Sequence, residues 1–146
     1  MHGKCSTLVL DLDGTISDPS LGIARCANHA LSSCGLPNVP AEAVHRQIGP
    51  PLDTLFENLA PGVSDAQLAA LIVAYRERYS DIGFAENELY PDVVATLTAL
   101  RDADLRLGVC TSKRADFAKR ILDLFEISQF FAFVDGGEVG VSKGTQ

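Results

Sequence analysis

Near its start the chain carries a short apolar run that ends in two closely spaced carboxylates. Residues 8–15 read LVLDLDGT, so Asp11 and Asp13 follow the run with one residue between them. Because the apolar residues are continuous rather than alternating, the run predicts a short buried β-strand. The two acids then lie where the strand leaves the sheet, which is the edge at which open α/β sheets bind ligands.

Two carboxylates this close resist being anions together unless a cation lies between them or one of them holds a proton. A hard divalent ion such as Mg²⁺ prefers carboxylate oxygens together with substrate phosphate. A protonated acid beside an ionised one instead supplies an acid and a nucleophile in one site. The competing interpretation is a plain hairpin, because Asp-Gly is a strong turn signal. Residues 16–20, however, supply no second alternating strand.

The stretch from residue 18 to residue 82 contains no strand candidate. Apolar positions at helical spacing predict four helices, at about 20–34, 41–48, 52–59 and 64–79. Ser20 is placed to cap the first helix and Gly35 to end it, while residues 64–67 (SDAQ) form a capping box. This stretch therefore predicts a small four-helix unit.

After residue 82 strands alternate with helices. Helices are expected at 92–103 and 115–125, and strands at 105–110 and 130–134. The alternation predicts a parallel, Rossmann-like α/β sheet in three layers with right-handed crossovers. The helical stretch interrupts it after the first strand, so we expect an α/β core of residues 1–17 and 83–146 and a helical-bundle cap of residues 18–82.

Composition excludes several classes of protein. The net charge is −7 and no basic stripe occurs, so a nucleic-acid partner is not expected. The apolar runs are too short to span a membrane, and the first seven residues lack the features of a secretory signal, so we expect a cytoplasmic protein. Its four cysteines fit no zinc spacing and are expected to be reduced thiols. The sequence carries no signal of oligomeric state.

The order of the motifs resembles that of the haloacid dehalogenase-like (HAD) phosphohydrolases. The segment DLDGT looks like the first motif of this family, Thr111 like the second, and Lys143 like the third. A helical insertion between the first and second motifs marks a recognisable subgroup. Within it, the segments QIGPPL (47–52), LYP (89–91) and TSK (111–113) look like the phosphoglycolate phosphatase-like branch.

This resemblance implies a Mg²⁺-dependent phosphatase that acts on a small phosphorylated metabolite similar to phosphoglycolate. Asp11 would attack phosphorus and become an aspartyl phosphate, and Asp13 would serve as acid and then as base. The carboxylate of Asp11 and the backbone carbonyl of Asp13 would hold the Mg²⁺. Thr111 and Lys143 would bind the phosphoryl oxygens; the alternatives are a helix cap for Thr111 and a solvated charge for Lys143.

The remaining expected substrate contacts are Thr15, Ser112, Lys113 and Arg46. Thr15 lies in the link to the cap, which is expected to close over the site and exclude water. Ser112 and Lys113 follow Thr111, where backbone N–H groups before a helix suit phosphate. Arg46 is a cap cation that would meet an anionic leaving group; the alternative is a solvated surface charge.

The sequence departs from the family pattern near its end. A fourth, acidic motif completes the Mg²⁺ site of the family and follows the lysine after a further strand. Asp135 and Glu138 precede Lys143 and do not match it. We therefore expect a C-terminally truncated version of a longer protein, with the sheet core incomplete and the first strand left at a sheet edge.

Three other interpretations stay open. A mutase or a nucleotidase would use the same core, whereas Asp13 argues against a dehalogenase or phosphonate hydrolase, because those family members lack an acid at that position. A phosphoreceiver-like binding module also combines acids, Mg²⁺, a hydroxyl residue and a lysine, but it has no helical insertion after its first strand. Finally, the chain would be a catalytically incomplete fragment if its site lacks essential groups.

Overall fold

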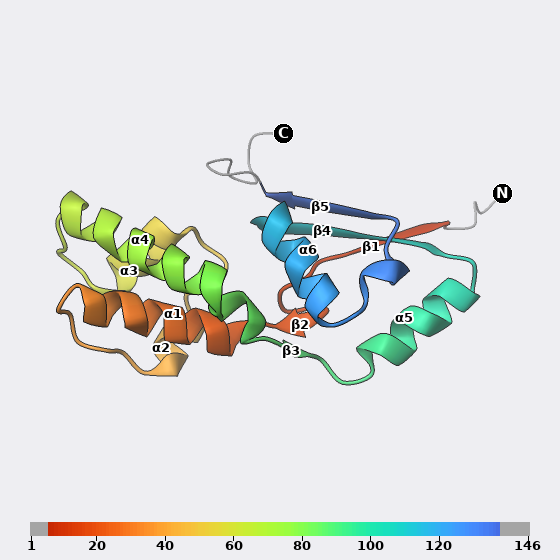
Figure 1. The fold of residues 1–146 in the computed structure, drawn as a ribbon, viewed down its shortest axis with the longest axis horizontal. Coiled ribbons are helices and arrows are strands. Elements are labelled where there is room, and N and C mark those ends of the chain that lie inside the picture. The colour runs from red at the N-terminus through yellow and green to blue at the C-terminus, as the bar shows by residue number, and fades with distance from the viewer. Residues whose placement is uncertain (1–5, 138–146) are drawn as a thin grey trace. The chain divides into compact units, whose positions relative to one another are not determined.

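The structure is a computed structural model, and it describes residues 6–137. The chain divides into two compact units, whose α-helices and strands are labelled in Figure 1. One is an α/β unit built from the residues up to Asp18 together with those from Glu88 onward, and the other is a helical unit, Pro19–Asn87. The helical unit ends beyond the expected residue 82, because the segment after its last long helix packs on its first: the Gly22 N–H donates to the Glu86 carbonyl at 3.0 Å.

The α/β unit contains a parallel sheet in the order β1-β4-β5. Its strands are β1 (Thr7–Leu10), β4 (Arg106–Arg114) and β5 (Phe133–Gly137). The helices α5 (Val93–Asp102) and α6 (Ala115–Leu124) pack on the sheet, and the short 3-10 helix η2 (Ser128–Phe130) precedes β5. This arrangement confirms the parallel α/β class that the sequence predicts.

The helices cover one face of the sheet. Both crossovers step across it in the same direction, and right-handed connections then place α5 and α6 on the same side. Leu107 and Val109 point to that side and are fully buried. Val9 and Phe133 both pair with Gly108 of β4, and their side chains point to the other face of the sheet. Val9 is 49% exposed there. The expectation that the whole first strand is buried is therefore wrong for the described chain, because only one of its faces is covered there.

A short two-stranded ribbon joins the α/β unit to the helical segment in sequence. The strand β2 (Ser17–Asp18) pairs antiparallel with β3 (Glu88–Leu89). The hairpin alternative is wrong, because β2 does not pair with β1.

The helical unit contains four α-helices, which are α1 (Ser20–Ser33), α2 (Ala41–His45), α3 (Leu52–Leu59) and α4 (Asp65–Asp81), followed by the 3-10 helix η1 (Gly83–Ala85). The expected capping box is present: Ser64 Oγ accepts from the Gln67 N–H, and Gln67 Oε1 accepts from the Ser64 N–H. Gly35 ends α1 with a φ of 71°.

Three local expectations need correction. Ser20 is the first residue of α1 and Pro19 precedes it, so the expected hydroxyl cap is not formed. The helix α2 ends at His45 rather than near residue 48. The last strand begins at Phe133 rather than near residue 130, because residues 128–130 form η2 before the chain reaches the sheet.

Candidate active site

The loop after β1 holds its two acids apart by burying the residue between them. Leu12 is fully buried, and its carbonyl accepts the N–H groups of Ile16 at 2.9 Å and of Ser17 at 3.2 Å. Gly14 makes the turn with a φ of 79°, a left-handed value that glycine adopts without strain. Because Leu12 anchors the loop, the positions of Asp11 and Asp13 on either side of it are fixed by the fold.

Asp11 lies directly after β1 and is exposed. Its Oδ1 accepts the Leu12 N–H at 2.8 Å. This bond restricts the rotation of the side chain, and the carboxylate remains within reach of solvent. An exposed, oriented carboxylate of this kind is suited to attack on an incoming electrophile.

Asp13 lies in a different environment. Its Oδ2 forms an ion pair with Lys113 Nζ at 3.0 Å, and the exposed fractions of the two side chains are 25% and 11%. Its Oδ1 is buried and has no hydrogen-bond partner among the described residues. Burial raises the pKa of Asp13; the ammonium of Lys113 opposes this rise, and the negative charge of Asp11 adds to it. Asp13 therefore holds a proton more readily than an ordinary aspartate.

The carboxyl end of β4 supplies the neighbouring groups. Thr111 is 4% exposed, and its Oγ1 accepts the backbone N–H of Lys113 at 3.2 Å. The sequence predicts that this strand ends at residue 110, but β4 continues to Arg114 with an irregular register against β5. Gly137 allows the end of β5 to lie close to the backbone of Ser112 in β4. A Cβ at position 137 would lie 2.5 Å from the Ser112 carbonyl oxygen.

The structure brings Asp11, Asp13, Thr111, Ser112 and Lys113 to one edge of the parallel sheet. The register explains this, because Leu10 pairs with Val109, so the chain leaves β1 beside the residues that lead to Thr111. Thr15 is exposed in the loop after Asp13, and Ser112 is also exposed. The roles expected for these residues stay predictions.

Two further residues were expected at the site. Lys143 is outside the described residues. Arg46 belongs to the helical unit, where it is exposed directly after α2, and its contact with a substrate stays a prediction.

Sequence reasoning missed two features of the site. Lys113 was expected to contact substrate, but the sequence did not reveal its ion pair with Asp13. A partial signal existed, since Asp13 follows one strand and Lys113 lies at the carboxyl end of the neighbouring parallel strand. The second feature is Ser17, whose side chain is fully buried and whose hydroxyl has no hydrogen-bond partner among residues 6–137.

The acids of this loop fit a Mg²⁺ site of the kind that relies on substrate. No group of three or more His, Cys, Asp or Glu side chains within residues 6–137 is arranged to hold a metal. Mg²⁺ commonly takes only one or two carboxylates and completes its shell with water and substrate phosphate. The exposed carboxylate of Asp11 is an oxygen donor of the required chemistry, and the main-chain carbonyl of Asp13 offers a second oxygen from the same loop.

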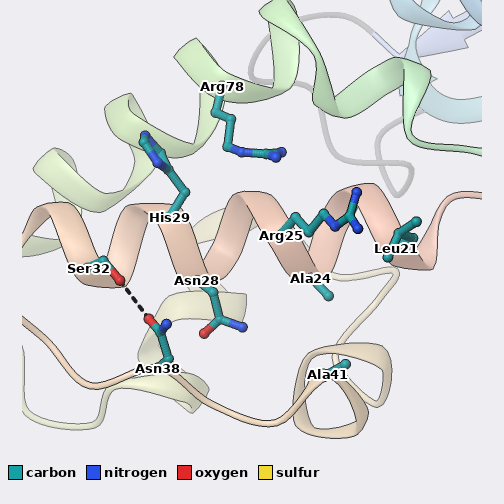
Figure 2. Close-up of a pocket in the computed structure, with 9 residues that line it drawn as sticks. All are labelled: Leu21, Ala24, Arg25, Asn28, His29, Ser32, Asn38, Ala41 and Arg78. Atoms are coloured by element: carbon teal, nitrogen blue, oxygen red, sulfur yellow. Dashed lines mark hydrogen bonds between the residues drawn. The ribbon is translucent and has the colours of Figure 1, made fainter.

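The helical unit has a surface hollow of about 430 Å³, lined mainly by α1 (Figure 2). Arg25 and Arg78 reach it, but both are engaged by Glu86: Arg25 Nη1 lies 2.8 Å from Oε1, and Arg78 Nη1 lies 2.7 Å from Oε2. Asn28 is also engaged, because its side chain makes two hydrogen bonds to the backbone of Val39. None of the site residues that the sequence predicts lines this hollow.

No helix in the described part of the chain is long and apolar enough to cross a membrane.

Comparison with known sequences identifies one family. The family described as Haloacid dehalogenase-like hydrolase matches residues 8–143. A tyrosine-protein kinase, PtkA of Mycobacterium tuberculosis, is 36% identical over 139 residues, which cover 95% of this chain and 47% of that protein. A 5'-nucleotidase of Pseudomonas aeruginosa is 33% identical over 90% of this chain and 59% of its own length. A phosphoglycolate phosphatase of Yersinia pestis is 33% identical over 93% of this chain and 60% of its own length.

Solved structures of related proteins have a similar fold. A haloacid dehalogenase-like hydrolase of Streptococcus pneumoniae superposes with a TM-score of 0.81 at 28% identity, covering 91% of this chain and 61% of that one. The structure of PtkA of Mycobacterium tuberculosis gives a TM-score of 0.78 at 37% identity, covering 97% and 65%. The chain thus spans about half to two thirds of the length of the proteins it matches.

Proposed function

The chain belongs to the haloacid dehalogenase-like hydrolases, and we therefore propose that the protein is a Mg²⁺-dependent phosphatase of small phosphate monoesters. One observation carries the proposal: two neighbouring aspartates have unlike environments. Asp11 is exposed and oriented, while Asp13 is largely buried, paired through one oxygen and inclined to hold a proton. Neighbouring carboxylates in unlike environments are typical of a nucleophile beside an acid–base group.

In the first half of the reaction, a carboxylate oxygen of Asp11 attacks phosphorus. The bond between phosphorus and the ester oxygen breaks, and its electron pair goes to that oxygen. Asp13 transfers its proton there, so the product leaves as a neutral alcohol. An aspartyl phosphate on Asp11 remains.

In the second half, Asp13 is a carboxylate and acts as the base. It takes a proton from a water molecule whose oxygen attacks phosphorus, and the bond from phosphorus to Asp11 breaks. Inorganic phosphate leaves and both aspartates return to their starting states.

The other groups at the sheet edge would stabilise the phosphoryl charge. The hydroxyl of Thr111 would donate to a phosphoryl oxygen, and family resemblance assigns a further contact to Lys143. Asp11 and the main-chain carbonyl of Asp13 would hold Mg²⁺, which supplies Lewis-acid stabilisation when bound. The helical unit would serve as a cap, with Thr15 in the link and Arg46 facing the alcohol part of the substrate.

Phosphoglycolate is the substrate that we propose. The sequence segments of the phosphoglycolate phosphatase-like branch support it, as does the relative of that name in Yersinia pestis. A nucleoside monophosphate is the second candidate, because a 5'-nucleotidase is equally similar in identity.

The direct test is phosphate release by the full-length protein with Mg²⁺, using phosphoglycolate, a nucleoside monophosphate and p-nitrophenyl phosphate. Asp11→Asn should lower release to the uncatalysed level, because the amide cannot form the intermediate. Asp102→Asn, the same change at an exposed aspartate of α5, should have no effect. Full activity of Asp11→Asn would contradict the assignment of the nucleophile. Transfer from ATP to a tyrosine peptide without monoester hydrolysis would contradict the phosphatase.

A further inference from the structure

The two carboxylate oxygens of Asp13 are not equivalent. Oδ2 lies 3.0 Å from Lys113 Nζ. Oδ1 is buried and has no hydrogen-bond partner among the described residues. A buried carboxylate oxygen without a partner loses the hydrogen bonds that water would give it, so a donor that reaches it meets an acceptor with no competing bond. The geometry thus singles out one oxygen for chemistry.

Lys113 is itself held in place. It belongs to β4, its backbone N–H donates to Thr111 Oγ1 at 3.2 Å, and its side chain is only 11% exposed. A lysine at the surface would lose much side-chain entropy in making such a pair, but burial has already restricted this one. A charge-assisted bond from a restrained ammonium fixes the rotation of the carboxylate that accepts it.

We infer that Lys113 is a positioning residue, which holds Asp13 by Oδ2 so that Oδ1 gives the proton to the leaving group and later takes one from water. This inference rests on the proposed function. In the first step the Oδ1–H bond breaks and the proton goes to the ester oxygen as its bond to phosphorus breaks. In the second step Oδ1 receives a proton from the attacking water. Lys113 exchanges no proton in either step.

This role differs from a substrate contact in what it predicts. A lysine that binds the phosphoryl group or the rest of the substrate helps all leaving groups of similar size to a similar degree. A lysine that aligns the acid helps most where the leaving oxygen needs a proton. An acidic phenol such as p-nitrophenol departs readily as an anion, whereas unsubstituted phenol or p-methoxyphenol gains more from protonation.

The experiment measures kcat/KM of the full-length protein with Mg²⁺ on a series of para-substituted phenyl phosphates. This ratio reports the steps up to departure of the phenol. In the unaltered protein the dependence on phenol acidity should be shallow. In Lys113→Met it should become steep, with a loss of about 10²-fold on phenyl phosphate and less than about threefold on p-nitrophenyl phosphate. A burst of p-nitrophenolate should also appear, because the second step has lost its aligned base.

Three controls make the outcome decisive. Lys119→Met is the same change at an exposed lysine of α6 and should leave the series unaltered. Lys113→Arg keeps a charged donor and should restore part of the loss. In an Asp13→Asn background, Lys113→Met should no longer steepen the dependence, because the group it aligns is gone.

A uniform loss across the whole series would overturn the inference and make Lys113 a substrate contact. The Lys113→Arg variant gives a second reading of the same series if Lys113→Met does not fold, with melting curves as the check. Failure of the proposed function looks different, because the unaltered protein would then hydrolyse none of these esters.

Discussion

Each unit contains a carboxylate that is paired with a cationic side chain, but the pKa values of the two carboxylates shift in opposite directions. In the helical unit, Glu86 Oε1 accepts from Arg25 and from Arg78, and Oε2 accepts from Arg78. In the α/β unit, Asp13 has one oxygen paired with Lys113 and the other without a partner. The hydrogen bonds from Arg78 are the main reason that the pKa of Glu86 is lowered, whereas burial raises the pKa of Asp13.

The difference separates an acid that stabilises the fold from one to which the proposed mechanism gives a reactive role. Glu86 has a partner on each oxygen, so its charge is stabilised and it joins the end of η1 to α1 and α4. Asp13 is held firmly but incompletely, and its remaining oxygen has capacity for a new bond. A partly satisfied buried carboxylate beside a nucleophile indicates function better than an ion pair alone does.

The largest expected effect comes from removing the reactive acid. Asp13→Asn should lower kcat/KM on phosphoglycolate by about 10²- to 10⁴-fold, the usual contribution of general acid–base catalysis. Glu86→Gln, assayed well below its melting temperature, should retain most of the activity. Steady-state kinetics of the two variants decide the matter. Equal losses in both would remove the distinction between the two carboxylates.

The second prediction concerns the contribution of Glu86 to the stability of the folded protein. Glu86→Gln should lower the free energy of unfolding by about 1–3 kcal/mol, because it leaves Arg78 partly buried without a carboxylate partner. Glu77 is an exposed glutamate of α4, the helix that carries Arg78. Glu77→Gln should change the free energy of unfolding by less than about 0.5 kcal/mol. Urea titrations followed by circular dichroism measure both. No difference between the two variants would show that the Glu86 pairs contribute nothing measurable.

The smallest effect is a pH dependence. The pKa of Glu86 is lowered from its usual 4.5 in the folded state, so its pairs stabilise the protein fully above that value. This contribution is lost as the pH falls through the lowered pKa. The difference in unfolding free energy between the unaltered protein and Glu86→Gln should therefore be constant near neutral pH and shrink below about pH 4.5. A difference that grows on acidification would contradict the assigned direction.

Much of the fold follows from local sequence patterns. The capping box of Ser64 and Gln67 predicts the start of α4, and Gly35 predicts the end of α1. The bounds of α3 are also those expected from the sequence. Each of these features depends on residues close in sequence. The expectation for Val9 failed because burial depends on which faces of the sheet are covered, and the composition of a single strand does not encode this.

The sequence predicts which residues gather at this edge of the sheet, but it does not predict the bonds between them. Motif order and strand ends select Asp11, Asp13 and Thr111, and the roles of these residues stay predictions. The pairing of Asp13 with Lys113 required the register of β1 against β4 and the continuation of β4 past residue 110. That continuation depends on close packing against Gly137, a tertiary contact that no local pattern reveals.

A covalent intermediate at Asp11 is the central feature of the proposed mechanism. The most direct measurement is rapid acid quenching of the full-length protein during turnover of p-nitrophenyl phosphate with Mg²⁺, followed by mass spectrometry of its peptides. Phosphate should be found on Asp11, and it should accumulate in Asp13→Asn, because that variant lacks the base that releases it. Turnover with no phosphorylated peptide, or with the phosphate on another residue, would contradict the account.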